Sequence, residues 1–360
     1  MKRAVLLSLT IFLASCNNQG VKAPATPTLE GYVALGDSLT AGFQSNGLTA
    51  DGQRNSFPVL LSKLAGYPIN APLGKNPGCP PPLPKTLLDV TADSCTRLEP
   101  DARIGNLGVP GARLEDLNTR TSANLSSNNP GEAALYNLIL GPTETQVSAA
   151  IKAKPQFITL WTGSNNWLLP LLSLPPTPIT SAEIFETQYA ALLEALKPAT
   201  DGAKVVLITV PGPEQAPVIT SSATLLAFGV GEEDCKTSLN KFNGVYVLKM
   251  FNEKKKIACS TDPNVLTPAL LEGTKKTIDA YNASIRKLAL ARGFKVFDVS
   301  TLTATTLKNE YNPFSPNQPF GADLSLDGVH PSSAGYAKIA NALGQFINES
   351  FGTKIPIPAS

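Results

Sequence analysis

Gly31-Tyr32-Val33-Ala34-Leu35 runs directly into Gly36-Asp37-Ser38-Leu39, so that an apolar stretch ends in a short polar turn. Continuous apolar runs of this length are typical of strands that are buried on both faces of a parallel sheet. In an open α/β fold, chemistry takes place beyond the carboxyl ends of such strands. The sequence therefore places the Ser38 hydroxyl at the rim of a sheet, as a candidate reactive group.

Apolar runs alternate with helical patterns along the rest of the chain, which predicts an α/β fold with a parallel sheet covered on both faces. Further strands are expected at 103–109, 156–161, 203–210 and 294–299, and helices at 57–65, 144–154, 182–196, 272–292 and 332–350. We expect one large domain over residues 30–360, with insertions at about 67–100 and 213–268. The first insertion is rich in proline, which removes backbone donors that a helix or a central strand needs.

The first sixteen residues have the anatomy of an export signal. Two basic residues precede a short apolar run that ends in small residues, and the run is too short to span a membrane. The stretch Leu13-Ala14-Ser15-Cys16 resembles the lipobox of bacterial lipoproteins, where cleavage before the cysteine accompanies lipidation of its thiol. We expect a signal peptide over 1–15, a lipidated tether over 16–29 and attachment to the cell envelope by lipid alone. An ordinary signal peptide with an incidental Cys16 is the alternative.

The charge balance bears on the partners of the protein. The 360-residue chain has a formal net charge of +2, and loss of Lys2 and Arg3 with a signal peptide would bring the charge to zero. Nucleic-acid binding rests on Lys and Arg that neutralise phosphates, so this balance argues against a nucleic-acid partner. The sequence gives no indication of an oligomeric state.

Four further cysteines, Cys79, Cys95, Cys235 and Cys259, form an even set. In an oxidising compartment, disulfides are the default for such a set. Proximity along the chain favours the pairs Cys79–Cys95 and Cys235–Cys259, although four cysteines allow three pairings. A zinc site is the alternative, but the chain lacks CxxC spacing and has one histidine. We therefore expect no metal site built from cysteine or histidine.

A serine nucleophile needs a general base, and the base needs an orienting partner. The single histidine of the chain is His330, three residues after Asp327 in a glycine-containing turn. A carboxylate at this spacing can accept a hydrogen bond from one ring nitrogen and leave the other nitrogen for Ser38. An Asp-x-x-His pair also arises by chance, and a capping or surface role would explain it equally well. Any Ser–His mechanism in this chain must nevertheless use His330.

Attack on an ester carbonyl builds negative charge on oxygen, and hydrogen-bond donors must be held ready for it. Candidates at the strand ends are the backbone N–H groups of Ser38 and Gly111 and the side-chain amide of Asn165. An ordinary turn after proline would also explain Gly111, and a helix N-cap would explain Asn165. The Gly-x-Ser-x-Gly elbow of α/β-hydrolases does not match the turn at Ser38, so that class of hydrolase is disfavoured.

Four blocks in order resemble the SGNH, or GDSL, hydrolase family: Gly-Asp-Ser-Leu at 36–39, Gly111, Gly-x-Asn at 163–165 and Asp-x-x-His-Pro at 327–331. The resemblance implies a three-layer α/β/α fold with a flavodoxin-like, mostly parallel sheet, and a serine esterase or lipase that needs no cofactor. It implies that Ser38 is the nucleophile, His330 the base and then the acid, and Asp327 the partner of His330. Gly111 and Asn165 would form the oxyanion hole with the Ser38 amide. The family usually has Asp after the Asn of the third block, where this chain has Asn166, which we interpret as a supporting residue.

Apolar residues near the third and fourth blocks bear on the substrate. Trp167–Leu172 follow the third block, and Tyr311, Phe314 and Phe320 precede the fourth. These residues would either line an acyl pocket or pack in the core. An acyl pocket favours an acyl-lipid or other fatty ester, whereas its absence favours removal of acetyl groups from a cell-surface polysaccharide. A binding lipoprotein without turnover is a third hypothesis, and the intact serine, aspartate and histidine count against it.

Overall fold

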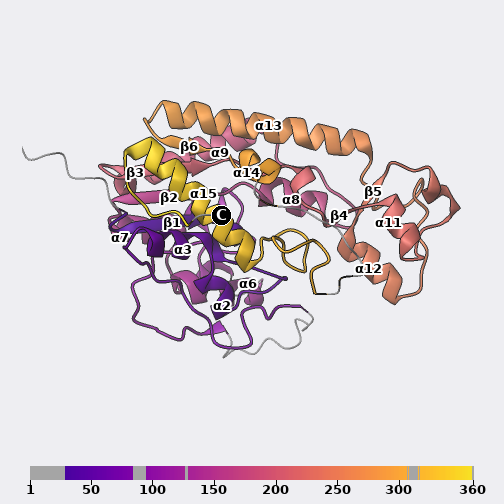
Figure 1. The fold of residues 1–360 in the computed structure, drawn as a ribbon, viewed down its shortest axis with the longest axis horizontal. Coiled ribbons are helices and arrows are strands. Elements are labelled where there is room, and N and C mark those ends of the chain that lie inside the picture. Colours follow the sequence, from indigo (N-terminus) through magenta and orange to yellow (C-terminus); the bar gives the residue numbers. More distant parts are fainter. Residues whose placement is uncertain are drawn as a thin grey trace, which may run out of the picture.

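A four-stranded parallel sheet forms the centre of the structure (Figure 1). The computed structural model describes residues 29–83, 95–125, 129–305, 307, 315 and 317–358. The strands are β1 (Tyr32–Gly36), β2 (Phe157–Trp161), β3 (Lys204–Ile208) and β6 (Lys295–Phe297), and they lie in the order β1-β2-β3-β6. All three neighbouring pairs are parallel. The expected signal peptide over 1–15 and the lipidation site Cys16 lie outside the described residues.

The segment 103–109, which was expected to be a strand, is not one. It runs beside β1 and is joined to it by bonds from Ala34 N to Gly105 O (2.9 Å), Leu107 N to Ala34 O (2.8 Å) and Val109 N to Gly36 O (3.0 Å). Its pairing with β1 amounts to one parallel bridge, between Ala34 and Asn106. The Asn106 side chain accepts a bond from the nearby Gly108 N–H at 3.1 Å. Gly36 N, the next β1 donor on this edge, bonds instead to the Gln146 side chain at 2.9 Å. The ladder is interrupted there, so the segment follows the sheet edge without extending the sheet as a strand.

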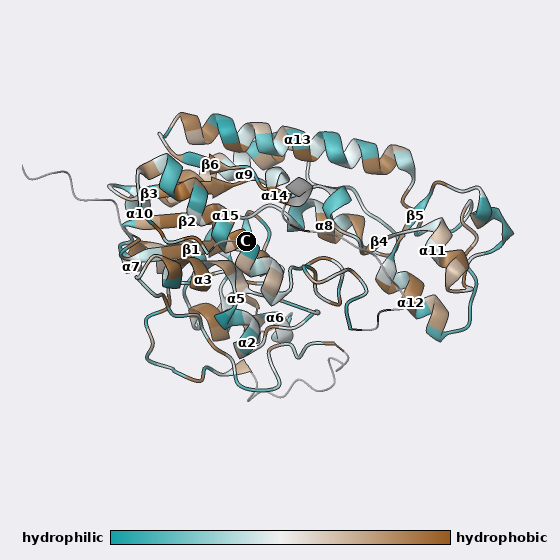
Figure 2. Cartoon of the chain, in the orientation of Figure 1, coloured by the Kyte–Doolittle hydropathy of each residue, from teal (hydrophilic) through white to brown (hydrophobic). Residues whose placement is uncertain are grey.

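Two hydrophobic cores cover the two faces of the sheet, because successive strand residues point to opposite faces. Val33 and Leu35 belong to one core, whereas Tyr32 and Ala34 belong to the other. Helices of the first core are α6 (Pro130–Leu140), α7 (Gln146–Ala153), α9 (Ala182–Ala195) and α13 (Pro268–Leu290). Helices of the second core are α3 (Phe57–Leu64) and α15 (Ser333–Phe351). The fold is therefore a three-layer α/β/α arrangement, and Figure 2 shows the apolar strands between striped helices.

Local signals set the ends of the helices. The Thr267 side chain accepts a bond from Leu270 N, and Pro268 occupies the first turn of α13. This pairing of an N-cap residue with an N-terminal proline begins a helix, so α13 starts at Pro268, before the expected position 272. The remaining expected helices and the other expected strands are present, with ends within two residues of the predicted ones.

Short elements fill the connections. They are α1 (Ser38–Ala41), α2 (Ala50–Arg54), α4 (Asp116–Thr119), α5 (Ser122–Leu125), α8 (Asn165–Leu171), α10 (Lys197–Thr200) and α14 (Ser300–Thr305). The expected first insertion has no α-helix and no strand in its described parts, 67–83 and 95–100. A disulfide joins the buried Cys79 and Cys95 in it.

The second insertion, 213–268, protrudes at the end of the molecule away from α7 (Figure 1). Its elements are η3 (Pro213–Gln215), β4 (Ile219–Ser221), α11 (Ser222–Ala227), η4 (Glu233–Lys236), β5 (Lys241–Asn243) and α12 (Gly244–Asn252). Strands β4 and β5 pair antiparallel. A small separate core lies around Leu225, Phe242 and Met250.

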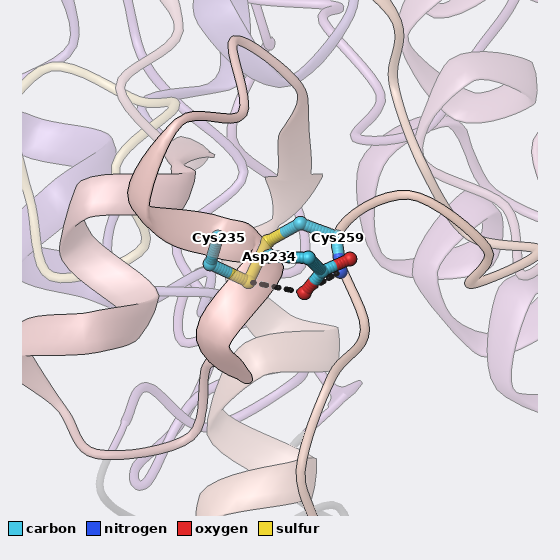
Figure 3. A group of neighbouring side chains, drawn as sticks. All are labelled: Asp234, Cys235 and Cys259. Carbon is cyan, nitrogen blue, oxygen red and sulfur yellow. Dashed lines mark hydrogen bonds between the residues drawn. A yellow bond between two sulfur atoms is a disulfide. The ribbon is translucent and has the colours of Figure 1, made fainter.

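A disulfide between Cys235 and Cys259 fastens this small core (Figure 3). Asp234 lies beside it and accepts hydrogen bonds from Cys259 N (3.1 Å), Ser260 N (2.8 Å) and the Ser260 hydroxyl (2.6 Å). Because the two sulfurs are bonded to each other, this cluster of an aspartate and two cysteines offers no thiolate ligand to a metal.

The two disulfides bear on the cellular compartment of the protein. Both disulfides join the pairs that proximity favoured. Disulfides persist in oxidising compartments and are rare in the cytosol, so the two bonds indicate an exported protein. Within the described part of the chain, no helix has the length and apolar character needed to cross a membrane.

We predict that the double substitution Cys235→Ser/Cys259→Ser loosens the second insertion alone. A cross-link that closes a loop of about this size contributes roughly 3 kcal/mol by limiting the unfolded chain. Since the insertion has its own core, limited proteolysis should cut within 213–268 faster in the variant, while the sheet stays resistant. The matched control is Cys79→Ser/Cys95→Ser, which should leave cleavage in 213–268 unchanged, and equal cleavage of both variants there would contradict the prediction.

Candidate active site

Ser38 is placed by the tight turn at the end of β1. Gly36 has a φ of +154°, and a Cβ there would lie 2.1 Å from the Trp161 carbonyl oxygen, so the position requires glycine. The buried Gln146 side chain accepts a bond from Gly36 N at 2.9 Å and donates one to Gly36 O at 2.9 Å. Asp37 caps the one-turn helix α1, which begins with Ser38. The Gln146 side chain and the Asp37 cap therefore fix the backbone on either side of Ser38.

The structure brings Ser38, His330 and Asp327 together in a chain of hydrogen bonds. The Ser38 Oγ lies 2.8 Å from His330 Nε2, and His330 Nδ1 lies 2.9 Å from Asp327 Oδ2. A carboxylate can only accept, so Nδ1 carries a proton and, in the neutral ring, Nε2 accepts from the Ser38 hydroxyl. This arrangement can transfer the serine proton to the imidazole.

The Asp327 carboxylate is held in its ionised form. Its Oδ1 accepts bonds from Val329 N and His330 N, each at 2.9 Å, and its Oδ2 also accepts one from Asn46 N at 2.8 Å. Burial by itself would raise the pKa of Asp327, but the charge on His330 and the bonds from His330 and Asn46 outweigh burial and lower the pKa to about 2. Asp327 therefore remains a charged partner for His330 throughout the neutral range.

The turn at Ser45 and Asn46 supports Asp327 and was not predicted from the sequence. Both residues have left-handed backbone angles, with φ of 53° and 58°. Ser45 N donates to the Ser325 hydroxyl at 2.9 Å, and Leu326 N donates to the Ser45 hydroxyl at 3.2 Å. The only local signal was a polar Ser-Asn pair, which tolerates this conformation but does not reveal its distant partner.

Phe43 packs against the His330 ring, and Tyr336 in turn holds Phe43. The Phe43 ring meets the His330 ring edge-on, with centroids 4.9 Å apart. The Tyr336 hydroxyl, carried by α15, donates to Phe43 O at 3.0 Å. These contacts limit the orientations open to the imidazole.

Two of the three expected oxyanion donors, Asn165 and Gly111, lie in different surroundings. Asn165 is the first residue of α8, and its Nδ2 donates to Ala112 O at 2.9 Å. An amide nitrogen has two hydrogens, so the second can serve a ligand oxygen. Asn165 lines the same cavity as Ser38, whereas Gly111 lines a separate polar hollow with Arg113 and other side chains. Gly111 has a φ of +81°, which explains the glycine at that turn.

Asn166, which departs from the family pattern, joins two loops. It is fully buried, and its Oδ1 accepts a bond from Leu114 N at 2.9 Å. Its Nδ2 donates to Glu115 Oε2 at 3.2 Å and to Thr180 Oγ1 at 3.3 Å. An aspartate at this position would lose both donated bonds and place a second carboxylate against Glu115. Asn166, which is neutral and can donate hydrogen bonds, is therefore compatible with the neighbouring Glu115 carboxylate.

Asp37 is a second buried carboxyl beside the site. Its Oδ1 accepts a bond from Leu39 N at 3.0 Å, and its Oδ2 has no hydrogen-bond partner among the described residues. Burial raises the pKa of Asp37 to about 7, and the opposing effects of the Leu39 N–H and of His330 are smaller. Near neutral pH, a large fraction of Asp37 is therefore protonated, whereas Asp327 is ionised.

An apolar cavity of about 70 Å³ opens beside the Ser38 hydroxyl. Trp167 and Leu168 line it, as one interpretation of the sequence expected, together with Leu324 and Val329. Phe320 lies elsewhere, on a second groove. Tyr311 and Phe314 lie outside the described residues.

The fold therefore places a Ser-His-Asp geometry, of the kind that serine hydrolases use, at the carboxyl end of a parallel sheet. Residues 32–343 match the model of the GDSL-like lipase/acylhydrolase family. Because this match covers most of the chain, the protein belongs to that family and is an ester-bond hydrolase. The comparison with curated proteins gives no match.

Several solved structures are similar over nearly their whole length. A family 3 carbohydrate esterase from Clostridium thermocellum is 16% identical, with a TM-score of 0.39 and coverage of 91% of this chain and 98% of that chain. A possible lipase from Chitinophaga pinensis is 16% identical, with a TM-score of 0.41 and coverage of 88% and 97%. A lipase/acylhydrolase from Enterococcus faecalis is 14% identical, with a TM-score of 0.39 and coverage of 91% and 99%.

We predict that Asn166→Asp destabilises the protein by about 1–3 kcal/mol near pH 7, because it removes two donated bonds and sets two carboxylates side by side. Burial and the neighbouring Glu115 carboxylate should raise the pKa of the introduced aspartate in the folded state, so the loss should grow as the pH rises from about 5 to about 8. Urea unfolding of the variant and the wild type at both pH values measures the effect. Adding Glu115→Gln should restore most of the stability, and an unchanged loss in the double variant would refute the explanation.

We predict a different pH dependence for Asp37→Asn. A folded-state pKa of about 7 means that wild-type Asp37 lowers stability progressively between about pH 4 and pH 7, by up to about 4 kcal/mol, since only the unfolded chain ionises there. Asparagine keeps an oxygen for the Leu39 N–H and cannot ionise. Unfolding free energies should therefore shift in favour of the variant as the pH rises. The exposed Asp101→Asn serves as a control, and a difference that is constant with pH would contradict the prediction.

Proposed function

We propose that the protein is a serine esterase or lipase in which Ser38 is the nucleophile, and the observation that carries this proposal is the hydrogen-bonded chain Ser38–His330–Asp327. As Ser38 Oγ bonds to the ester carbonyl carbon, His330 Nε2 takes its proton. The ionised Asp327 stabilises the imidazolium that forms. His330 then gives the proton to the alcohol oxygen as the carbon–oxygen bond breaks, and it activates a water that releases the acyl group.

The negative charge on the carbonyl oxygen needs donors. We assign these to the Ser38 amide, the Asn165 side chain and the Gly111 amide. The support is strongest for Asn165, whose side chain shares a cavity with Ser38. Oxyanion donors of this kind act because they are already in place when charge develops.

The acyl group that the site accepts is short and apolar. At about 70 Å³, the cavity beside Ser38 is far smaller than pockets that hold drug-sized ligands. Its lining of Trp167, Leu168 and Val329 offers contacts to carbon rather than to charge. Removal of an acetyl group from a polysaccharide is the second candidate, because a cavity of this size also suits acetyl.

We also propose that a lipid on Cys16 holds the enzyme at the cell envelope. The support is the lipobox-like stretch Leu13-Ala14-Ser15-Cys16 and the export that the two disulfides indicate. Stable attachment requires more than one acyl chain on the anchor. In this proposal, residues 16–29 are the tether that connects the anchor to the catalytic domain.

We predict that Ser38→Ala lowers kcat for p-nitrophenyl acetate by at least about 10⁴-fold, because loss of the nucleophile disables the whole triad. Release of p-nitrophenol measures the rate, and a fluorophosphonate probe should label the wild type but not the variant. The melting temperature should stay close to that of the wild type, since only a hydroxyl is removed. The control Ser173→Ala should keep full activity, and retained activity in Ser38→Ala would overturn the mechanism.

A further inference from the structure

A second apolar groove, of about 260 Å³, lies between helix α12 and the loop that carries Asp327. We propose that this groove binds an alkyl chain on the alcohol side of the ester substrate. The inference rests on the proposed function and extends it, since it assigns the leaving group to a lipid-like alcohol and not to a sugar. The side chains that matter to the argument are Val245, Leu248, Phe251, Phe228, Phe320 and Leu326.

Helix α12 has large apolar side chains that are not buried in the core of the insertion. Tyr246, Val247 and Met250 are buried in the core of the insertion. Leu248 and Phe251 are three residues apart, so they share a face of the helix, and they remain 57% and 50% exposed. Phe228 of the insertion is also exposed and packs edge-on against Phe251, with ring centroids 6.3 Å apart. A cluster of large exposed apolar side chains around a hollow is characteristic of a ligand site.

The lining selects an uncharged ligand. Among the described residues that line the groove, Asp327 is the ionisable one, and both of its oxygens already accept hydrogen bonds. Asn46 and Thr220 are the other polar side chains there. A sugar would need several polar partners for its hydroxyls, and a charged ligand would need a countercharge. An alkyl chain needs neither, and a hollow between α12 and the loop that carries Asp327 fits a chain better than it fits a flat membrane surface.

The position of the groove indicates that it binds the alcohol portion of the ester substrate. Val218 N donates to Gly328 O at 2.9 Å and joins the segment 216–218 to the loop 327–330, which is the catalytic loop of the proposed mechanism. Ala216 and His330 line the acyl cavity, whereas Val218 and Asp327 line the groove. The groove therefore lies across the catalytic loop from the acyl cavity. Since His330 protonates the leaving oxygen, the alcohol must lie on the His330 side of Ser38, and a chain on that oxygen can cross the loop into the groove.

A series of acetate esters tests this, because the acyl group stays constant while the alcohol lengthens. For the wild type, we expect kcat/KM to rise at least tenfold from ethyl acetate to decyl acetate. The variant Leu248→Ser/Phe251→Ser should lose this rise and keep its rate on ethyl acetate. Leu239→Ser, at a position that is 81% exposed and outside the groove, is the matched control and should behave as the wild type. Melting temperatures of both variants verify folding.

A binding experiment separates the groove from catalysis. Ser38→Ala protein should bind the fluorescent apolar probe N-phenyl-1-naphthylamine, and adding Leu248→Ser/Phe251→Ser should abolish this binding. If esters are hydrolysed but the groove variant keeps the wild-type chain-length dependence, the groove assignment is overturned and the proposed function stands. If the variant loses only co-sedimentation with phosphatidylglycerol vesicles, the face is a membrane contact and the assignment is equally overturned. Absence of hydrolysis of any ester would overturn the proposed function, and the assignment with it.

Discussion

Four hydrogen bonds on one buried carboxylate hold the candidate active site together. Asp327 accepts bonds from Val329 N, from both the backbone and the ring of His330, and from Asn46 N, which is 281 residues away along the chain. A buried charge is tolerated only when it is paired and fully hydrogen-bonded, so the loops around Asp327 must keep their positions for the fold to be stable. The same bonds orient His330 toward Ser38. The stability of the fold and the geometry of the candidate site thus depend on the same contacts.

The two carboxyls next to Ser38 show how environment divides chemical roles. Asp37 and Asp327 are both buried, but Asp327 has enough donors to keep its charge, whereas Asp37 has an oxygen without a partner in the described structure. Burial consequently raises the pKa of Asp37 and is outweighed at Asp327. The ionised carboxylate is the one that faces the histidine, as a Ser-His-Asp mechanism requires.

The features of this protein that could be predicted from the sequence are those with a local signal. The turn at 36–39, the Asp-x-x-His pair and the Gly-x-Asn block each lie within a few residues, and together they led to the right fold class and to residues that the structure brings together. The strand predicted at 103–109 did not form, because β propensity cannot anticipate that Gly36 N bonds to the Gln146 side chain, 110 residues away, and not to this segment. The position of Phe320 could not be predicted either: it lines the second groove instead of the cavity beside Ser38, because that choice depends on how the insertion packs.

The sequence by itself determined the alternation of strands and helices, the order of the four blocks and the identity of the one available histidine, since these depend on residue types and short spacings. Only the tertiary structure decided that the left-handed turn at Ser45–Asn46 supports Asp327, that the Gln146 side chain holds Gly36 by two hydrogen bonds, and that α12 forms a groove beside the loop that carries Asp327. These contacts join segments that are distant along the chain. They arise only when the layers pack and polar groups that are thereby removed from water find partners in whichever segment lies opposite.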